Sequence, residues 1–154
     1  MAQQLARDIM TPDPITVSPD MSVTDAAHLM ATKRIGALPV VDADGALIGL
    51  VTEGDLIMQD VKVHFPTYLH LLGGFIFYPG STERFESELK KAVGATVSDV
   101  MTAEPLTVTV SASMEDVATL LVERDVSRAP VLDGERLVGI ISKSDIIRAL
   151  AAEK

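Results

Sequence analysis

Two short stretches of this chain combine a hydroxyl and a carboxylate at the same spacing. Thr52 is followed three residues later by Asp55, and Ser142 is followed three residues later by Asp145. This spacing is typical of a helix start, where the hydroxyl caps the first turn and the carboxylate lies near the positive end of the helix dipole. The same groups could also bind a nucleotide, because such a helix start attracts phosphate and a carboxylate accepts hydrogen bonds from ribose. The pattern occurs at many helix starts, so taken alone it does not distinguish the two roles.

The two stretches belong to a sequence that is duplicated about ninety residues apart. Residues 10–42 align with residues 101–133 without gaps and share 12 identities at 33 positions. The segment Leu47–Asp55 returns in the same way as Leu137–Asp145. A single repeat cannot bury its apolar face alone. We therefore expect the two copies to pack together and to form paired clefts where they meet.

Each copy predicts the same order of elements. Ser22 and Ser113 each precede apolar residues at helical spacing, with an aspartate three residues after the serine, as in a capped amphipathic helix. Two apolar runs joined by an Asp/Gly turn then indicate a β-hairpin, and a second helix begins near Asp55 and near Ser144. Each copy therefore reads strand, helix, strand, strand, helix. The predicted fold class is α/β, with two βαββα units.

The composition limits the classes of function. The chain has 154 residues, is 47% hydrophobic and 23% charged, and carries a formal net charge of −9. This negative charge disfavours binding to nucleic acid. The absence of cysteine excludes disulfides, thiolate metal sites and cysteine nucleophiles. The N-terminal residues lack the apolar core of a signal peptide and no apolar stretch is long enough to cross a bilayer, so we expect a cytoplasmic protein with no membrane partner.

Neither a metal site nor a catalytic site is predicted. The three histidines, His28, His64 and His70, lack the spacing of metal ligands. No nucleophile with an adjacent base can be argued from the order of the residues. We therefore expect a protein that is not an enzyme.

The segment between the copies, residues 58–96, breaks the symmetry. It holds all the aromatic residues of the chain, which are Phe65, Tyr68, Phe75, Phe77, Tyr78 and Phe85. Aromatic side chains usually supply buried area, so we favour packing on the same domain or on a partner subunit over a lid for a ligand.

Three sequence motifs in fixed order, each present twice, resemble the CBS domain, which is named after cystathionine β-synthase. The motifs are Met-Thr-x-x-Pro-x-Thr-Val, a strand that contains Pro-Val and ends at Asp, and Gly-x-x-Ser/Thr-x-x-Asp. Two such domains in tandem resemble a CBS pair, or Bateman module, with a pseudo-twofold axis. The resemblance divides the chain into a first repeat at residues 7–57, the aromatic-rich segment 58–96 and a second repeat at residues 98–152, together one compact module.

The resemblance implies that the clefts bind an adenosine ligand, with AMP, ADP or ATP as the expected nucleotide and with no cofactor required. Asp55 and Asp145 would bind the ribose hydroxyls, and Thr52 and Ser142 would contact phosphate or ribose. The adenine would lie in an apolar slot between the opening strand and the proline-bearing strand, which suits a purine. The implied contact residues of these strands are Thr16, Ala37, Leu38 and Val40 in the first copy and Thr107, Arg128, Ala129 and Val131 in the second.

The copies differ in charge where phosphate would lie. The second copy has Arg128 and Lys143, whereas the first has Ala37 and Glu53 at the matching positions. Because cations attract phosphate and a carboxylate repels it, we predict that the cleft around Asp145 is the stronger nucleotide site.

We interpret the chain as a regulatory module that binds an adenine nucleotide and senses energy or metabolite levels. It would act through a homodimer formed on the helical face or through a protein effector. Lys33 and Arg34 could help to bind phosphate from the opposite copy, or could lie on the solvated surface. Two other functions stay open: a ligand-free protein-interaction module, and binding of S-adenosylmethionine, which shares the adenosine contacts but carries no phosphate.

Overall fold

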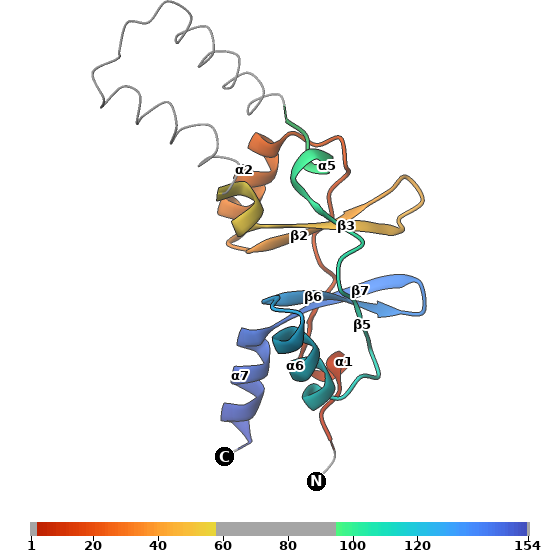
Figure 1. The fold of residues 1–154 in the computed structure, drawn as a ribbon, viewed down its shortest axis with the longest axis vertical. Coiled ribbons are helices and arrows are strands. Elements are labelled where there is room, and N and C mark those ends of the chain that lie inside the picture. Colours follow the sequence, from red (N-terminus) through yellow and green to blue (C-terminus); the bar gives the residue numbers. More distant parts are fainter. Residues whose placement is uncertain (1–2, 58–94, 154) are drawn as a thin grey trace, which may run out of the picture.

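The computed structural model of the chain describes residues 3–57 and 95–153. Two small sheets lie in the middle of the molecule, and helices cover their outer sides (Figure 1). The aromatic residues between Phe65 and Phe85, which we expect to pack on the domain or on a partner subunit, lie outside the described residues.

Each repeat contributes one antiparallel hairpin. In the first sheet β2 (Ala37–Val41) pairs with β3 (Leu47–Thr52), and in the second sheet β6 (Arg128–Asp133) pairs with β7 (Arg136–Ser142). The short strand β5 (Val108–Thr109) runs parallel to β6 at the edge of the second sheet. Both hairpins that the sequence predicted are confirmed.

The helices follow the predicted order in both repeats. In α2 (Val23–Lys33) and α6 (Met114–Glu123), the hydroxyl of the preceding serine accepts a hydrogen bond at 3.0 Å from the amide of the aspartate three residues later. Residues 53–57 are helical after β3, and α7 (Lys143–Ala152) follows β7. The predicted α/β class with two βαββα units is confirmed. Among the residues that the structure describes, no helix is long and apolar enough to cross a membrane.

The first residues of each repeat lie on the other repeat, which the sequence did not predict. Strand β1 (Thr11–Pro12) pairs with β7 of the second repeat, and β4 (Thr102–Ala103) pairs with β3 of the first. The one-turn helices before these strands are exchanged in the same way: α1 (Ala6–Ile9) packs against α6 and α7, and α5 (Val97–Val100) packs against α2. Each sheet therefore includes chain from both repeats, and the two repeats form one module.

Two methionines hold the exchanged strands close to the hairpins. Met10 lies against Gly139 of β7, and Met101 lies against Gly49 of β3. The contact is so close that a side chain on either glycine would collide with the methionine sulfur. The repeated Met-Thr motif thus supplies the methionine of this contact, and the repeated hairpin motif supplies the glycine.

Each repeat has an apolar core that the exchanged helix completes. Ala6 of α1 is fully buried in the core of the second repeat, and Val97 of α5 is fully buried in the core of the first. The other buried residues are Val17, Ala26, Met30, Leu38, Val40 and Val51 in the first core and Val108, Val117, Leu121, Ala129, Val131, Ile141 and Ile146 in the second.

Candidate ligand-binding clefts

Thr52 and Asp55 are joined by hydrogen bonds where β3 ends and the helical residues 53–57 begin. Asp55 Oδ2 accepts hydrogen bonds from the Thr52 amide at 2.9 Å and from the Thr52 hydroxyl at 3.1 Å. In return, the Asp55 amide donates to Thr52 Oγ1 at 3.3 Å. This arrangement is a capping box, as the spacing predicted. Asp55 is half-buried, and none of the described residues donates a hydrogen bond to its other oxygen, Oδ1.

Ser142 and Asp145 repeat this arrangement at the start of α7. Asp145 Oδ2 accepts from the Ser142 amide at 2.8 Å and from the Ser142 hydroxyl at 3.0 Å, and the Asp145 amide donates to Ser142 Oγ at 3.2 Å. Here, however, Oδ1 is also occupied, because it accepts a hydrogen bond from Nη2 of Arg148 in the same helix. Asp145 is only 7% exposed. Both of its carboxylate oxygens are thus engaged by the protein.

The strands predicted to enclose the adenine lie side by side in both repeats. Val17 forms a parallel bridge with Val40, and Val108 pairs with Val131 in parallel. The preceding residues differ in exposure, since Thr16 is exposed and Thr107 is half-buried. Apart from Arg128, which is half-buried, the predicted contact residues of the proline-bearing strands are buried: Ala37, Leu38, Val40, Ala129 and Val131. Their side chains belong to the interior, so a ligand would meet them mainly through their backbone.

The two predicted phosphate-binding cations have different surroundings. Lys143 is exposed at the first position of α7. Arg128 instead reaches the first repeat, where its Nη1 donates a hydrogen bond to the Gly36 carbonyl at 2.5 Å. The carboxylate of Glu53 lies beside the same glycine. That both cations serve the Asp145 cleft stays a prediction, but Arg128 in this structure lies against the first repeat.

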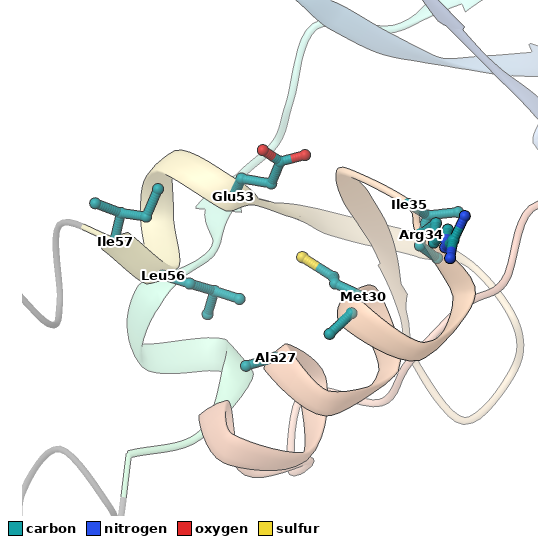
Figure 2. A pocket seen from close by; sticks show the side chains of 8 residues that line it. Ala27, Met30, Arg34, Ile35, Glu53, Leu56 and Ile57 are labelled. Atoms are coloured by element: carbon teal, nitrogen blue, oxygen red, sulfur yellow. The ribbon is translucent and has the colours of Figure 1, made fainter.

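A groove that the sequence did not predict lies between α2 and the helical residues 53–57 (Figure 2). Its volume is about 390 Å³, and Ala27, Met30 and Leu56 line it. Lys33 and Arg34, the two cations considered for phosphate, are both exposed at the end of α2, and of the two only Arg34 lines this groove. The small and apolar residues spaced along one side of α2 were the signal that could have indicated it. The groove belongs to the helical face and not to the predicted adenine slot.

No group of three side chains able to hold a metal ion occurs in the part of the chain that the structure describes.

The site residues predicted from the sequence lie at two helix starts and in two strand pairs. Arg148, which engages Asp145, was not among them.

The sequence matches a known family along most of its length. A profile of the CBS domain matches residues 6–61 and again residues 97–152. Protein MJ1426 of Methanocaldococcus jannaschii is 32% identical over 153 residues, which cover 95% of this chain and 90% of that protein. The chloroplastic CBS domain-containing protein CBSX2 of Arabidopsis thaliana is 33% identical over 146 residues, which cover 92% of this chain but 61% of CBSX2.

Solved structures have the same fold. The crystal structure of CBSX2 in complex with AMP superposes with a TM-score of 0.73 and 31% identity, over 97% of this chain and 98% of that chain. The CBS domain pair of protein MJ0100 in complex with 5′-methylthioadenosine and S-adenosyl-L-methionine superposes with a TM-score of 0.70 and 25% identity, over 96% of this chain and 99% of that chain.

Proposed function

Because this chain belongs to the CBS domain family and carries two such domains in tandem, we propose that it is a regulatory module that binds an adenosine-containing ligand and does not catalyse a reaction. The proposed ligand is an adenine nucleotide, AMP, ADP or ATP. The similarity to CBSX2, whose crystal structure contains AMP, supports this choice.

The observation that carries the proposal is the hydroxyl and carboxylate pair found at both helix starts. Thr52 lies opposite Ala37 in the first hairpin, and Ser142 lies opposite Arg128 in the second, so each pair adjoins the start of a proline-bearing strand. A ribose bound by the carboxylate would thus place its base next to that strand. The proposed binding residues are Thr16, Ala37, Leu38, Val40, Thr52, Asp55, Thr107, Arg128, Ala129, Val131, Ser142, Lys143 and Asp145.

Regulation requires that ligand binding change a second property of the protein. We propose a homodimer formed on the helical face, or contact with a protein effector, as the unit that responds. The exposed apolar side chains of the helices support such an interface, because Ile57, Val122, Ile147 and Leu150 are 50% to 68% exposed. A ligand would shift this assembly only by its difference in affinity for two states.

S-adenosylmethionine is a second candidate ligand. The related CBS pair of MJ0100 was solved with this molecule and with 5′-methylthioadenosine. Glu53, an exposed carboxylate beside Thr52, would favour a sulfonium cation over a phosphate in the first cleft. Nucleotides and S-adenosylmethionine can be distinguished experimentally, because the doubly charged phosphate of AMP depends more on Arg128 and Lys143 than the single carboxylate of S-adenosylmethionine, which also carries two cationic groups.

Isothermal titration calorimetry of the full chain tests the proposal with AMP, ADP, ATP, S-adenosylmethionine and adenosine. At least one adenine nucleotide is expected to bind with a Kd near the micromolar range, about −8 kcal/mol. The double variant Asp55→Asn/Asp145→Asn should lose this binding; because both aspartates also close a capping box, its thermal unfolding is measured to show that it is folded at the temperature of the titration. Binding of S-adenosylmethionine alone would favour the second candidate. An absence of binding across the panel would favour a ligand-free interaction module.

A further inference from the structure

The groove of the first repeat has a counterpart surface in the second repeat. Ala31 of α2 and Ile57 line the groove, and the matching positions in the second repeat are Val122 of α6 and Ile147 of α7. The helices α6 and α7 pack against each other, and residues 53–57 lie on the same side of the sheets as α7 (Figure 1). Each repeat therefore has an apolar helical face, and both faces belong to one side of the molecule.

The two faces differ in shape. In the first repeat, the small side chains of Ala27 and Ala31 line the groove. In the second repeat Val122 takes the position of Ala31 and is 68% exposed, and Ile147 is 65% exposed. Leu150, one turn further along α7, extends this projecting apolar surface. One face is thus hollowed where the other projects, and exposed apolar surfaces of this kind indicate a contact with protein.

The charges at the edges of the two faces are reversed. Arg34 and Glu53 line the groove, and the second repeat has Asp125 and Lys143 at the matching positions. All four side chains are exposed, and none forms an ion pair with another residue that the structure describes. Arg34 and Asp125 have the same left-handed backbone conformation, with φ of 54° and 52°, so their side chains start from equivalent positions. Each face therefore carries the charges that the other would attract.

These patterns distinguish two ways of pairing the helical faces of two copies. Because both repeats have the same fold, positions close to the axis of such a contact face their equivalents, whichever repeats take part. If each repeat met the same repeat of the other copy, Arg34 would face the partner's Arg34. If the first repeat met the second, Arg34 would face the partner's Asp125, and Ala31 would face the partner's Val122. The second arrangement pairs opposite charges and a small side chain with a larger one.

We propose that the helical faces form an antiparallel homodimer, in which the first repeat of each copy contacts the second repeat of the other. This inference rests on the homodimer of the proposed function and adds which repeats meet. Arg34 pairs with the partner's Asp125, and Glu53 pairs with the partner's Lys143, each twice by symmetry. Glu53 and Lys143 directly follow Thr52 and Ser142, so the interface adjoins both clefts.

Sedimentation equilibrium of the full chain without ligand tests the orientation through exchanged charges. Arg34→Asp and Asp125→Arg each place like charges opposite each other, and each should weaken dimerisation by about tenfold. The double variant Arg34→Asp/Asp125→Arg restores opposite charges and should dimerise like the wild type. Each substitution introduces the residue that the other repeat already has at this backbone conformation, so the fold should be kept. Thermal unfolding checks this.

Arg136→Asp is the matched control, because it makes the same change of charge at the exposed start of β7, away from the helices, and should leave dimerisation unchanged. The losses in the single variants should shrink at high salt, which screens exposed charges. In the opposite orientation each single variant replaces one like pair by another, so no loss would be measured. That result, or a loss that the double variant does not restore, would overturn the proposal.

Cross-linking measures the orientation independently, because the chain has no cysteine. After exchange of subunits, a mixture of Ala31→Cys and Val122→Cys should be cross-linked by a short bismaleimide, whereas neither variant should be cross-linked with itself. Asp44→Cys, in the exposed turn of the first hairpin, is the control and should not react with either. Cross-linking of Ala31→Cys or Val122→Cys with itself, or none in their mixture, would overturn the orientation.

Failure of this inference can be distinguished from failure of the proposed function. A chain that binds AMP in the calorimeter but sediments as a monomer, with and without AMP, overturns the dimer and leaves nucleotide binding in place. A dimer with the expected charge rescue that binds no ligand of the panel supports the inference and overturns the proposed ligand.

Discussion

The two clefts are alike in the groups that close the helix start and unlike in the groups around them. The hydrogen bonds between Thr52 and Asp55 and those between Ser142 and Asp145 match within 0.1 Å. Outside these bonds the symmetry ends. Asp55 is half-buried and none of the described residues donates to its Oδ1, whereas Asp145 is nearly buried and its Oδ1 is taken by Arg148.

This difference separates two roles that one residue type can have. The capping box is needed in both repeats, because each second helix must begin directly after its strand. The second carboxylate oxygen, Oδ1, has no part in the cap, so its hydrogen-bond partner can differ between the repeats. In the second repeat it stabilises α7 through Arg148, and in the first it is the group that we propose to bind ribose.

The largest expected effects concern the cores, where the repeats should behave alike. Leu121 and Met30 occupy matching positions on α6 and α2, and both are buried. Truncating either to alanine should cost about 2–5 kcal/mol of the free energy of unfolding. Because the exchanged helices join each core to the other repeat, chemical denaturation should give one cooperative transition for both variants. Two transitions, with only one shifted by each variant, would contradict a shared fold.

Substitution of the two aspartates should affect ligand affinity unequally. Asp55→Asn is expected to weaken AMP binding by about 10- to 100-fold, since hydrogen bonds to a charged group are worth roughly 1.5–3 kcal/mol. Asp145→Asn should change it far less, because Arg148 already occupies that carboxylate. Calorimetry of both variants measures the difference. Equal losses would make the clefts equivalent, and a larger loss in Asp145→Asn would restore the assignment predicted from the sequence.

The glycines beneath the exchanged methionines should be almost equally intolerant of a side chain. Gly139→Ala and Gly49→Ala each drive a Cβ against Met10 or Met101 and should cost about 1–3 kcal/mol. Gly139→Ala should cost more, because the Thr11 carbonyl lies 2.9 Å from its Cβ while the nearest carbonyl at Gly49 lies 3.1 Å away. Thermal unfolding measures both.

Gly54→Ala is the control for these two variants. The nearest atom to a Cβ at Gly54 is 3.6 Å away, which is ordinary contact, so its Tm should not fall. A Tm loss in Gly54→Ala as large as that in Gly139→Ala would show that the methionine contact is not the cause.

The smallest expected effect is a gain at the second cleft. Arg148→Met introduces the residue type that the first repeat has at the matching sequence position and frees Oδ1 of Asp145. Arg148 is 72% exposed, and an exposed ion pair is worth roughly 0.2–1 kcal/mol, so the weaker binding step should tighten by up to about fivefold. Calorimetry on the Asp55→Asn background isolates this step. No gain there would mean that Arg148 does not limit the cleft.

Much of the fold could be predicted because its signals are local. The serine caps of α2 and α6 and the capping boxes at Thr52 and Ser142 join residues three positions apart. Each hairpin closes over a short turn, between Val41 and Leu47 and between Asp133 and Arg136. The contact between Arg148 and Asp145 could also have been predicted, since residues three apart on a helix are neighbours. The exchange of β1 and β4 could not be predicted, because the Met-Thr motifs would have the same sequence whichever sheet they join.

By itself, the sequence determined the two repeats, their order of elements and the carboxylate at each helix start, since hydrogen bonds over three residues follow from spacing alone. Only the tertiary structure decided how the repeats share their sheets and which of them receives the guanidinium of Arg128. These contacts join groups about fifty or more residues apart, such as Leu50 and Thr102 or Arg128 and Gly36. Their partners are chosen by the packing of one repeat on the other, which no local pattern encodes.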